Sequence, residues 1–177
     1  GVCARRYTGE DGVELSIPGG SVQRVVETLL QSASTADAHR DAEALAQYVN
    51  EKGFRTLLSD KMIDTLLERL RSKKSAEDRE RAAIGLGAIA TKVGGKNAPM
   101  PLGAEPWLMQ ALPALLDGYG DKNEAAKKAA EGAVGAFVPL FPAEAASELL
   151  AVLYQVLESS SAKWQAKVGA LKIIARL

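Results

Sequence analysis

The chain has 177 residues, 47% of them hydrophobic and 25% charged, and its 22 basic side chains balance its 22 acidic ones. A balanced charge excludes attraction of the whole chain to nucleic acid but leaves local basic patches open. The single cysteine, Cys3, excludes an internal disulfide framework, and no apolar run approaches the length of a membrane span. We therefore expect a soluble intracellular protein.

Residue usage favours helices packed closely on helices. Aromatic residues make up only 5% of the chain, whereas alanine occurs about 30 times. A sheet core is usually richer in β-branched and aromatic side chains. Residues 1–20 differ, because glycines and Pro18 punctuate them and only VELSI alternates as a short strand does. We interpret them as an irregular arm, either an N-terminal extension or an expression remnant.

Residues 21–177 show the helical spacing of apolar side chains eight times. Ser21 is an N-cap residue, and Ser75 with Asp78 has the spacing of a capping box, although Asp replaces the preferred Glu or Gln. Pro106 and Pro142 suit first turns, whereas Pro113 should kink the helix around it. The predicted helices begin near residues 21, 37, 59, 75, 106, 121, 142 and 162, and end near 30, 52, 70, 93, 116, 138, 159 and 177.

The eight helices form four pairs with a shared rhythm. The second helices of the pairs align about 40 residues apart, and an apolar side chain follows three positions after each aligned residue. Two helices repeated at this period indicate a HEAT solenoid, with a compact helical bundle as the alternative. We predict an all-α HEAT-repeat solenoid of four helix pairs. The aligned residues are Leu45, Leu86, Val134 and Leu171.

The last predicted helix carries an apolar stripe that nothing in the chain covers. Val168, Leu171 and Ile174 share a helix face, and no polar capping unit follows them. A solenoid buries such a face by stacking a further repeat on it and ends in polar repeats. We therefore expect the domain at 21–177 to be truncated and the solenoid to continue beyond Leu177.

Motifs of catalysis and metal binding are nearly absent. His39 lies beside Arg40 and Asp41, as a solvated histidine does, and no nucleophile completes a triad with it. The GGKN at 94–97 lacks the spacing of a phosphate loop, and Cys3 has no partner for a metal. We predict no catalytic, cofactor-binding or metal site and no small-molecule substrate in this chain.

Basic residues gather in the turns between paired helices. When the pairs stack, these residues would align as a basic ridge able to meet RNA phosphates or an acidic protein surface. The alternative is an ordinary solvated surface, because carboxylates such as Glu77 and Glu124 alternate with the cations. The candidate contact residues are Arg69, Arg71, Lys73, Lys74, Arg79, Arg81, Lys122, Lys127, Lys128, Lys163 and Lys167.

The two tryptophans lie near helix starts, in AEPWLMQ and SAKWQAK. A tryptophan at such a position either wedges between repeats, where it buries a large area, or stays exposed as a hot spot for a partner. We expect Trp107 and Trp164 to pack.

Four segments, in order and at matching spacing, resemble the N-terminal HEAT region of fungal translation elongation factor 3. The segments are TADAHRDAEALAQYV, LRSKKSAEDRERAAIGLGAIA, AEPWLMQALPALLDGYGDKN and SAKWQAKVGALKII. The resemblance covers residues 21–177, and the E-P-W and K-W-Q-x-K motifs are its most specific parts. Residues 1–20 do not match the short start of that factor.

The resemblance implies a cytoplasmic, ribosome-bound ATPase that helps deacylated tRNA leave the exit site. Its HEAT region is a non-catalytic arm that contacts ribosomal proteins and rRNA, with no membrane partner, while ATP and Mg bind in cassettes downstream. Three alternatives stay open. They are the paralogue with a prion-like N-terminal extension, the elongation-factor-3-like region of a regulator of the amino-acid-starvation kinase, and a generic scaffold that binds a peptide or helix in the groove of the solenoid.

Overall fold

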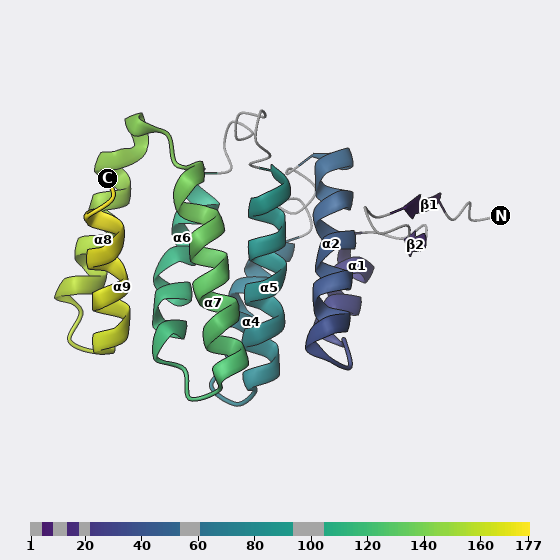
Figure 1. The fold of residues 1–177 in the computed structure, drawn as a ribbon, viewed down its shortest axis with the longest axis horizontal. Coiled ribbons are helices and arrows are strands. Elements are labelled where there is room, and N and C mark those ends of the chain that lie inside the picture. Colours follow the sequence, from purple (N-terminus) through teal and green to yellow (C-terminus); the bar gives the residue numbers. More distant parts are fainter. Residues whose placement is uncertain (1–4, 9–13, 18–21, 54–60, 94–104) are drawn as a thin grey trace.

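The computed structural model describes residues 5–8, 14–17, 22–53, 61–93 and 105–177. Helices in these ranges stand side by side in a row of pairs, with the strands at Arg5–Thr8 and Glu14–Ile17 at one end of the row and α9 at the other (Figure 1). The predicted all-α solenoid is therefore confirmed. The helices are α1 (Val22–Leu30), α2 (Thr35–Lys52), α4 (Met62–Leu70), α5 (Ala76–Val93), α6 (Glu105–Asp117), α7 (Glu124–Phe137), α8 (Ala146–Glu158) and α9 (Trp164–Ile174), with short 3-10 turns η1 (Gly118–Gly120), η2 (Val138–Leu140) and η3 (Ala143–Ala145).

The helices form two layers. The second helices of the pairs, α2, α5 and α7, pack against one another in sequence, and α4, α6 and α8 form the layer behind them. The strands β1 (Arg5–Thr8) and β2 (Glu14–Ile17) pair antiparallel, with Arg5 opposite Ile17. The strand expected at VELSI is thus present as β2, whereas the origin of the arm and the division near residue 20 stay predictions.

Side-chain caps place three helix starts. Ser34 Oγ accepts a hydrogen bond from the Asp37 amide at 3.1 Å, so α2 begins at Thr35, two residues before the predicted start. Ser75 Oγ caps the Asp78 amide at 3.0 Å, as predicted for the fourth helix. The Asn123 side chain accepts from the Ala126 amide at 3.0 Å, which moves the start of α7 from 121 to Glu124.

Other boundaries differ from the predictions in small ways. The third helix begins at Met62 after Lys61, whose φ of 54° is left-handed, while its predicted start near residue 59 and the GGKN at 94–97 lie outside the described residues. Helix α6 runs from Glu105 past Pro113 to Asp117, within one residue of its predicted bounds. The seventh predicted helix begins as η3 before becoming α8, and the eighth begins at Trp164 instead of 162.

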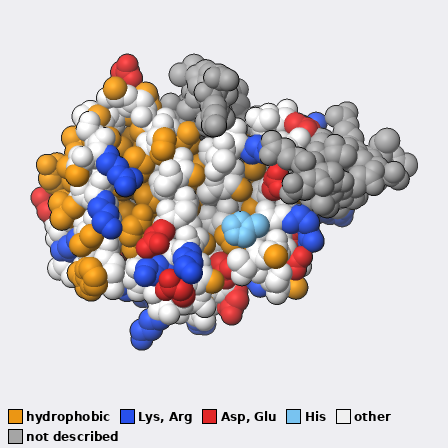
Figure 2. Space-filling view, viewed as in Figure 1, with side chains coloured by type: hydrophobic (Ala, Val, Ile, Leu, Met, Phe, Trp, Pro, Cys, Tyr) orange, Lys and Arg blue, Asp and Glu red, His pale blue; other side chains and the backbone are white. Residues whose placement is uncertain are grey.

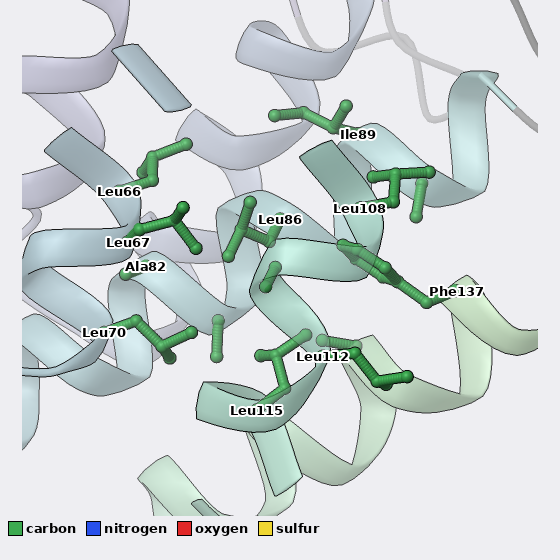
Figure 3. Packing of buried hydrophobic residues seen from close by; sticks show 14 of the residues in the cluster. Leu66, Leu67, Leu70, Ala82, Leu86, Ile89, Leu108, Leu112, Leu115 and Phe137 are labelled. Atoms are coloured by element: carbon green, nitrogen blue, oxygen red, sulfur yellow. The ribbon is translucent and has the colours of Figure 1, made fainter. Parts of the chain in front are cut away.

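One continuous hydrophobic core runs between the two layers (Figure 3). Three of the four aligned repeat positions, Leu45, Leu86 and Val134, are buried in it. The fourth, Leu171, is 53% exposed, as expected for the apolar stripe that nothing in the chain covers. Helix α9 instead buries a face that contains Ala166, Gly169, Ala170 and Ile173.

Helices α5 and α7 approach each other closely at Gly87. A Cβ on Gly87 would lie 3.2 Å from Ala133 Cα and 3.4 Å from Ala133 Cβ. Gly135, which also lies inside a helix of this pair, would have nothing within 4 Å of its Cβ. The two glycines therefore offer a matched test of the contact between α5 and α7.

We expect Gly87→Leu to lower the free energy of unfolding by about 1–3 kcal/mol, because the larger side chain must push α7 away. Gly135→Ala should raise it by about 0.5–1 kcal/mol, because alanine favours the helix and meets no neighbour. Urea unfolding followed by circular dichroism measures both changes. Two changes of the same sign would contradict the close contact at Gly87.

In the part of the chain that the structure describes, no single helix has the length and apolar composition needed to cross a membrane. The segments Glu124–Leu140 and Ala143–Glu158 meet that length and composition only together, across a bend of 111°.

Candidate functional site

The turns that join the two helices of each pair lie along one edge of the array, at the bottom of Figure 1. This edge carries most of the eleven predicted contact residues. The structure divides the eleven into two groups. Five make intramolecular contacts through their side chains, namely Arg69, Arg79, Arg81, Lys127 and Lys163.

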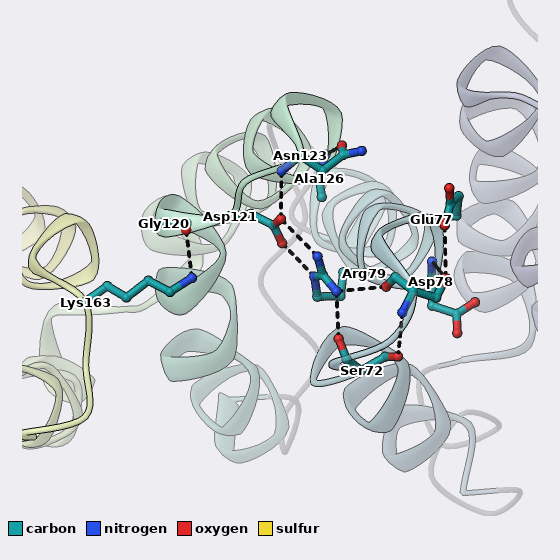
Figure 4. A network of polar contacts seen from close by, with 10 residues as sticks. Ser72, Glu77, Asp78, Arg79, Gly120, Asp121, Asn123, Ala126 and Lys163 are labelled. Atoms are coloured by element: carbon teal, nitrogen blue, oxygen red, sulfur yellow. Dashed lines mark hydrogen bonds and ion pairs between the residues drawn. The ribbon is translucent and has the colours of Figure 1, made fainter.

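Arg79 ties the second helix pair to the third (Figure 4). Its Nε donates to Asp121 Oδ2 at 2.6 Å and its Nη2 to Asp121 Oδ1 at 2.9 Å, while its Nη1 donates to the carbonyl oxygens of Ser72 and Ser75 at 2.8 and 3.0 Å. The Asp121 side chain is only 7% exposed and also accepts from the Asn123 amide. Arg79 is thus held by two turns at once.

The same ion pair changes the proton affinity of both groups. The hydrogen bonds from Arg79 lower the pKa of Asp121 below its ordinary 3.8 despite partial burial. The hydrogen bond to Asp121 raises the pKa of Arg79. Both directions favour the charged pair, as expected for a bidentate guanidinium–carboxylate contact in a shielded site.

Two further cations also bridge neighbouring pairs. Arg81 Nη1 donates to the carbonyl oxygen of Leu30 at 3.0 Å, and Lys163 Nζ donates to that of Gly120 at 2.7 Å. The remaining two pair locally: Arg69 with Asp78 at 3.1 Å, and Lys127 with Glu124 at 3.9 Å. Carbonyl groups at turn ends attract nearby cations. Arg79, Arg81 and Lys163 therefore bridge neighbouring helix pairs, whereas Arg69 and Lys127 form exposed local ion pairs that add little to stability.

The other six cations point away from such contacts. Among the described residues, no hydrogen bond or ion pair is made by the side chains of Arg71, Lys73, Lys74, Lys122, Lys128 or Lys167. The first four lie on two adjacent turns, and all four are exposed. We call this set, Arg71, Lys73, Lys74 and Lys122, the basic edge.

Lys128 and Lys167 lie off the basic edge. Lys128 lines a groove of about 560 Å³ on the face of α2, α5 and α7, together with His39 and Glu80. The floor of this groove consists of small residues of α5 and α7. His39 is exposed, as predicted, and Glu80, which is buried, accepts a hydrogen bond from Thr35 Oγ1 at 2.7 Å. In the described ranges, no group of three or more His, Cys, Asp and Glu side chains could hold a metal ion.

The two tryptophans have different environments. Trp107 packs partly buried against the core, as predicted. Trp164 is 70% exposed, so the expectation that it packs is wrong in this structure. It lines a second groove of about 840 Å³ between α7 and α9, which we call the terminal groove.

Helix α9 does not repeat the contact of α5 with α7 but packs against α6, α8 and η1. A Cβ on Gly169 would lie 2.9 Å from both Leu116 Cδ2 and Tyr119 Cε2, so α9 rests directly on the end of α6 and on η1. Burial, with a smaller effect of the Glu131 charge, raises the pKa of the Tyr119 phenol. Because α9 packs on α6 and η1, the terminal groove lies between α9 and α7.

Comparison with known proteins agrees with this architecture. The family model described as EF3 N-terminal HEAT repeat matches residues 38–177, most of the chain. The chain belongs to this family. The predicted resemblance to the HEAT region of elongation factor 3 is therefore confirmed, and the chain is a HEAT module of the kind found in translation factors.

Curated relatives match the module over most of its length but at modest identity. The mRNA export factor elf1 of Schizosaccharomyces pombe is 30% identical over 158 residues, which is 88% of this chain and 14% of that protein. The stalled ribosome sensor GCN1 of Homo sapiens is 28% identical over 156 residues, 88% of this chain and 6% of that protein. Elongation factor 3 of Gonapodya prolifera is 27% identical over 157 residues, 89% of this chain and 14% of that protein.

The HEAT module thus spans only a small part of the relatives that it matches. No solved structure matches it. Two features of the module were not predicted from the sequence. One is the set of partners of Arg79 and Arg81, which lie about 40 to 50 residues away along the chain, and the other is the terminal groove. The sequence feature nearest to the groove is GYG at 118–120, whose tyrosine, Tyr119, lines it.

Proposed function

We propose that this HEAT module docks an elongation-factor-3-like translation ATPase on the ribosome and contacts ribosomal proteins and rRNA through the basic edge. It performs no reaction itself. It supports elongation and the release of tRNA from the exit site by positioning cassettes that bind ATP and Mg elsewhere in the longer protein, in the cytoplasm. Membership of the EF3 family supports this proposal, as does similarity to relatives named elongation factor 3 and stalled ribosome sensor.

The observation that carries the proposal is that, among the described residues, the side chains of the basic edge make no hydrogen bond or ion pair. A cation already paired with a carboxylate gains little from a phosphate, because it must first give up its partner. Lys73 and Lys74 lie exposed on the turn that follows α4 and, in the described structure, have no carboxylate partner to give up before they bind a phosphate. Lys122 extends the same positive surface to the next turn. Turns projecting from one edge of a rigid array suit contact with an extended, negatively charged surface.

We expect the double variant Lys73→Glu, Lys74→Glu to weaken binding to purified ribosomes by about tenfold or more, because like charges then face phosphate. Co-sedimentation of the chain with ribosomes measures this. The matched control is Arg24→Glu, Lys61→Glu, which makes the same charge change at two exposed positions away from the basic edge. Equal binding by the wild type and the Lys73, Lys74 variant would remove the basic edge from the proposal.

A generic scaffold remains the second candidate, and the groove lined by Lys128 and His39 favours it. A module of this kind would bind a peptide or helix on the face of α2, α5 and α7. Substitution of Ala129 by Glu in the groove floor would then abolish partner capture, while the Lys73, Lys74 variant would bind normally. The opposite pattern favours ribosome docking. The remaining alternative is that the chain is the elongation-factor-3-like region of a starvation-kinase regulator, and the similarity to GCN1 supports it.

A further inference from the structure

We propose that the groove on the face of α2, α5 and α7 receives an arginine side chain of a partner peptide, whose guanidinium pairs with Glu80. We call this groove the central groove. Figure 2 shows the face that carries it, with charged side chains of both signs gathered along its lower part. The residues that line the central groove include none of the basic edge and none of α9. Occupation of the central groove therefore does not depend on the proposed docking to ribosomes.

Glu80 is a buried carboxylate that makes no ion pair in the described structure. The residue is 8% exposed, and one hydrogen bond reaches its side chain, from Thr35 Oγ1 to Oε1 at 2.7 Å. Burial of a carboxylate is unfavourable unless a cation or several hydrogen bonds compensate for the charge. The amino end of α2, which begins at Thr35, supplies only about half a positive charge. An incoming cation would therefore be bound favourably by Glu80.

Asp121, another nearly buried carboxylate, shows what compensates for such a charge in this fold. Its side chain is 7% exposed, and the Arg79 guanidinium donates two hydrogen bonds to it. The arginines on either side of Glu80 in the sequence are directed elsewhere, because Arg79 pairs with Asp121 and Arg81 donates to the carbonyl oxygen of Leu30. Neither is available to Glu80, so a guanidinium from a partner can take that place.

The floor of the central groove suits the aliphatic part of an arginine side chain. Small side chains form it, namely Ala83 of α5 with Ala129 and Gly132 of α7. A Cβ added to Gly132 would have nothing within 4 Å, so the space above the floor is open there. Arginine packs its methylene groups on apolar surface while its charged head reaches a polar partner. The volume of about 560 Å³ falls within the range of ligand-binding clefts and admits one long side chain with its backbone.

The charges that line the central groove favour a basic occupant. Glu124 and Lys128 line it from α7 one helical turn apart, so their opposite charges offset each other. His39 lines it from α2, and the charge of Glu80 is left without a counterpart. An acidic peptide or a phosphate would be repelled by that carboxylate. Arginine suits it better than lysine, because the planar guanidinium can pair with a carboxylate through two parallel hydrogen bonds.

The test follows the backbone amide signals of Ala83 and Gly132 by NMR during titration with a peptide. The probe is a blocked peptide of about nine alanine and serine residues with one arginine at its centre. The matched control peptide carries citrulline in place of arginine, which keeps the shape of the side chain and removes its charge. We expect the arginine peptide to shift both signals to saturation and the citrulline peptide to bind at least about fivefold more weakly.

Glu80→Gln tests the proposed pair directly. The variant keeps an oxygen that can accept from Thr35 and removes only the charge. We expect it to weaken binding of the arginine peptide by about tenfold or more and that of the citrulline peptide by less than about twofold. Equal weakening of both peptides would show that Glu80 only maintains the groove, which would overturn the proposal. Thermal unfolding checks that the variant is folded.

A second pair of variants tests the position of the peptide without changing any charge. Gly132→Leu fills the floor of the central groove and should weaken binding of both peptides by about tenfold or more. Gly135→Leu is the matched control, because its Cβ also meets nothing within 4 Å but Gly135 does not line the central groove. Normal peptide binding by Gly132→Leu would contradict the proposed location.

The double variant Lys73→Glu, Lys74→Glu, which tests docking to ribosomes, should bind the arginine peptide normally. Either proposal can therefore fail while the other holds. Equal binding of the arginine and citrulline peptides, or no shift with either, would overturn the present one. Displacement of the arginine peptide by a single-stranded oligoribonucleotide would assign the groove to nucleic acid instead. Shifts that grow with protein concentration alone would assign it to a second copy of this chain.

Discussion

Replacement of Arg79 by alanine should lower the free energy of unfolding by about 2–4 kcal/mol. The guanidinium makes four hydrogen bonds, two of them to a nearly buried carboxylate, and alanine leaves the shielded charge of Asp121 without its hydrogen-bonded cation. Urea unfolding monitored by circular dichroism measures the loss. Arg71→Ala, a control on the same turn without such contacts, should change the free energy by less than about 0.5 kcal/mol.

The Arg79–Asp121 pair also predicts a pH dependence. Because the folded-state pKa of Asp121 lies below its ordinary 3.8, the pair contributes its full stabilisation above that value. The contribution is lost as the pH falls through the lowered pKa and the carboxylate takes a proton. The difference in stability between the wild type and Asp121→Asn should therefore shrink below about pH 4. A constant difference from pH 7 to pH 2 would contradict the role given to this pair.

Replacement of Phe137 by alanine should lower the free energy of unfolding by about 3–5 kcal/mol. The ring is fully buried in α7 and belongs to the core cluster that includes Leu108 and Leu112 of α6 (Figure 3). The change removes apolar contact and leaves a cavity between the layers, which close-packed helices cannot fill completely.

An exposed aromatic residue provides the control for Phe137. Tyr154 lies on α8 and is 52% exposed, so Tyr154→Ala should cost no more than about 0.5–1 kcal/mol. Thermal or urea unfolding of the two variants gives the comparison. Similar losses in both would mean that the two helix layers do not pack as described.

The number and order of the helices could be predicted because their signals are local. Helical spacing, the cap at Ser75 and proline in the first turn of α6 all act within a few residues. The contacts of α9 depend on distant residues, because its Gly169 packs against Leu116 and Tyr119, about 50 residues earlier.

The candidate contact residues show the same division between local and distant information. The sequence placed eleven cations near the turns, but it could not tell a bound arginine from a free lysine. Arg79 and Lys73 look equivalent in the sequence, yet one meets a carboxylate 42 residues away and the other meets none in the described structure. Only the stacking of the pairs makes that distinction.

We propose that the basic edge contacts ribosomal phosphate while Arg79, Arg81 and Lys163 connect the helix pairs. The most direct test is the salt dependence of binding to purified ribosomes by the wild type and by Lys73→Gln, Lys74→Gln. Each phosphate contact contributes roughly one unit to the slope of log K against log salt, so removal of two should reduce the slope by about two while thermal unfolding stays unchanged. A slope equal to that of the wild type would contradict the account.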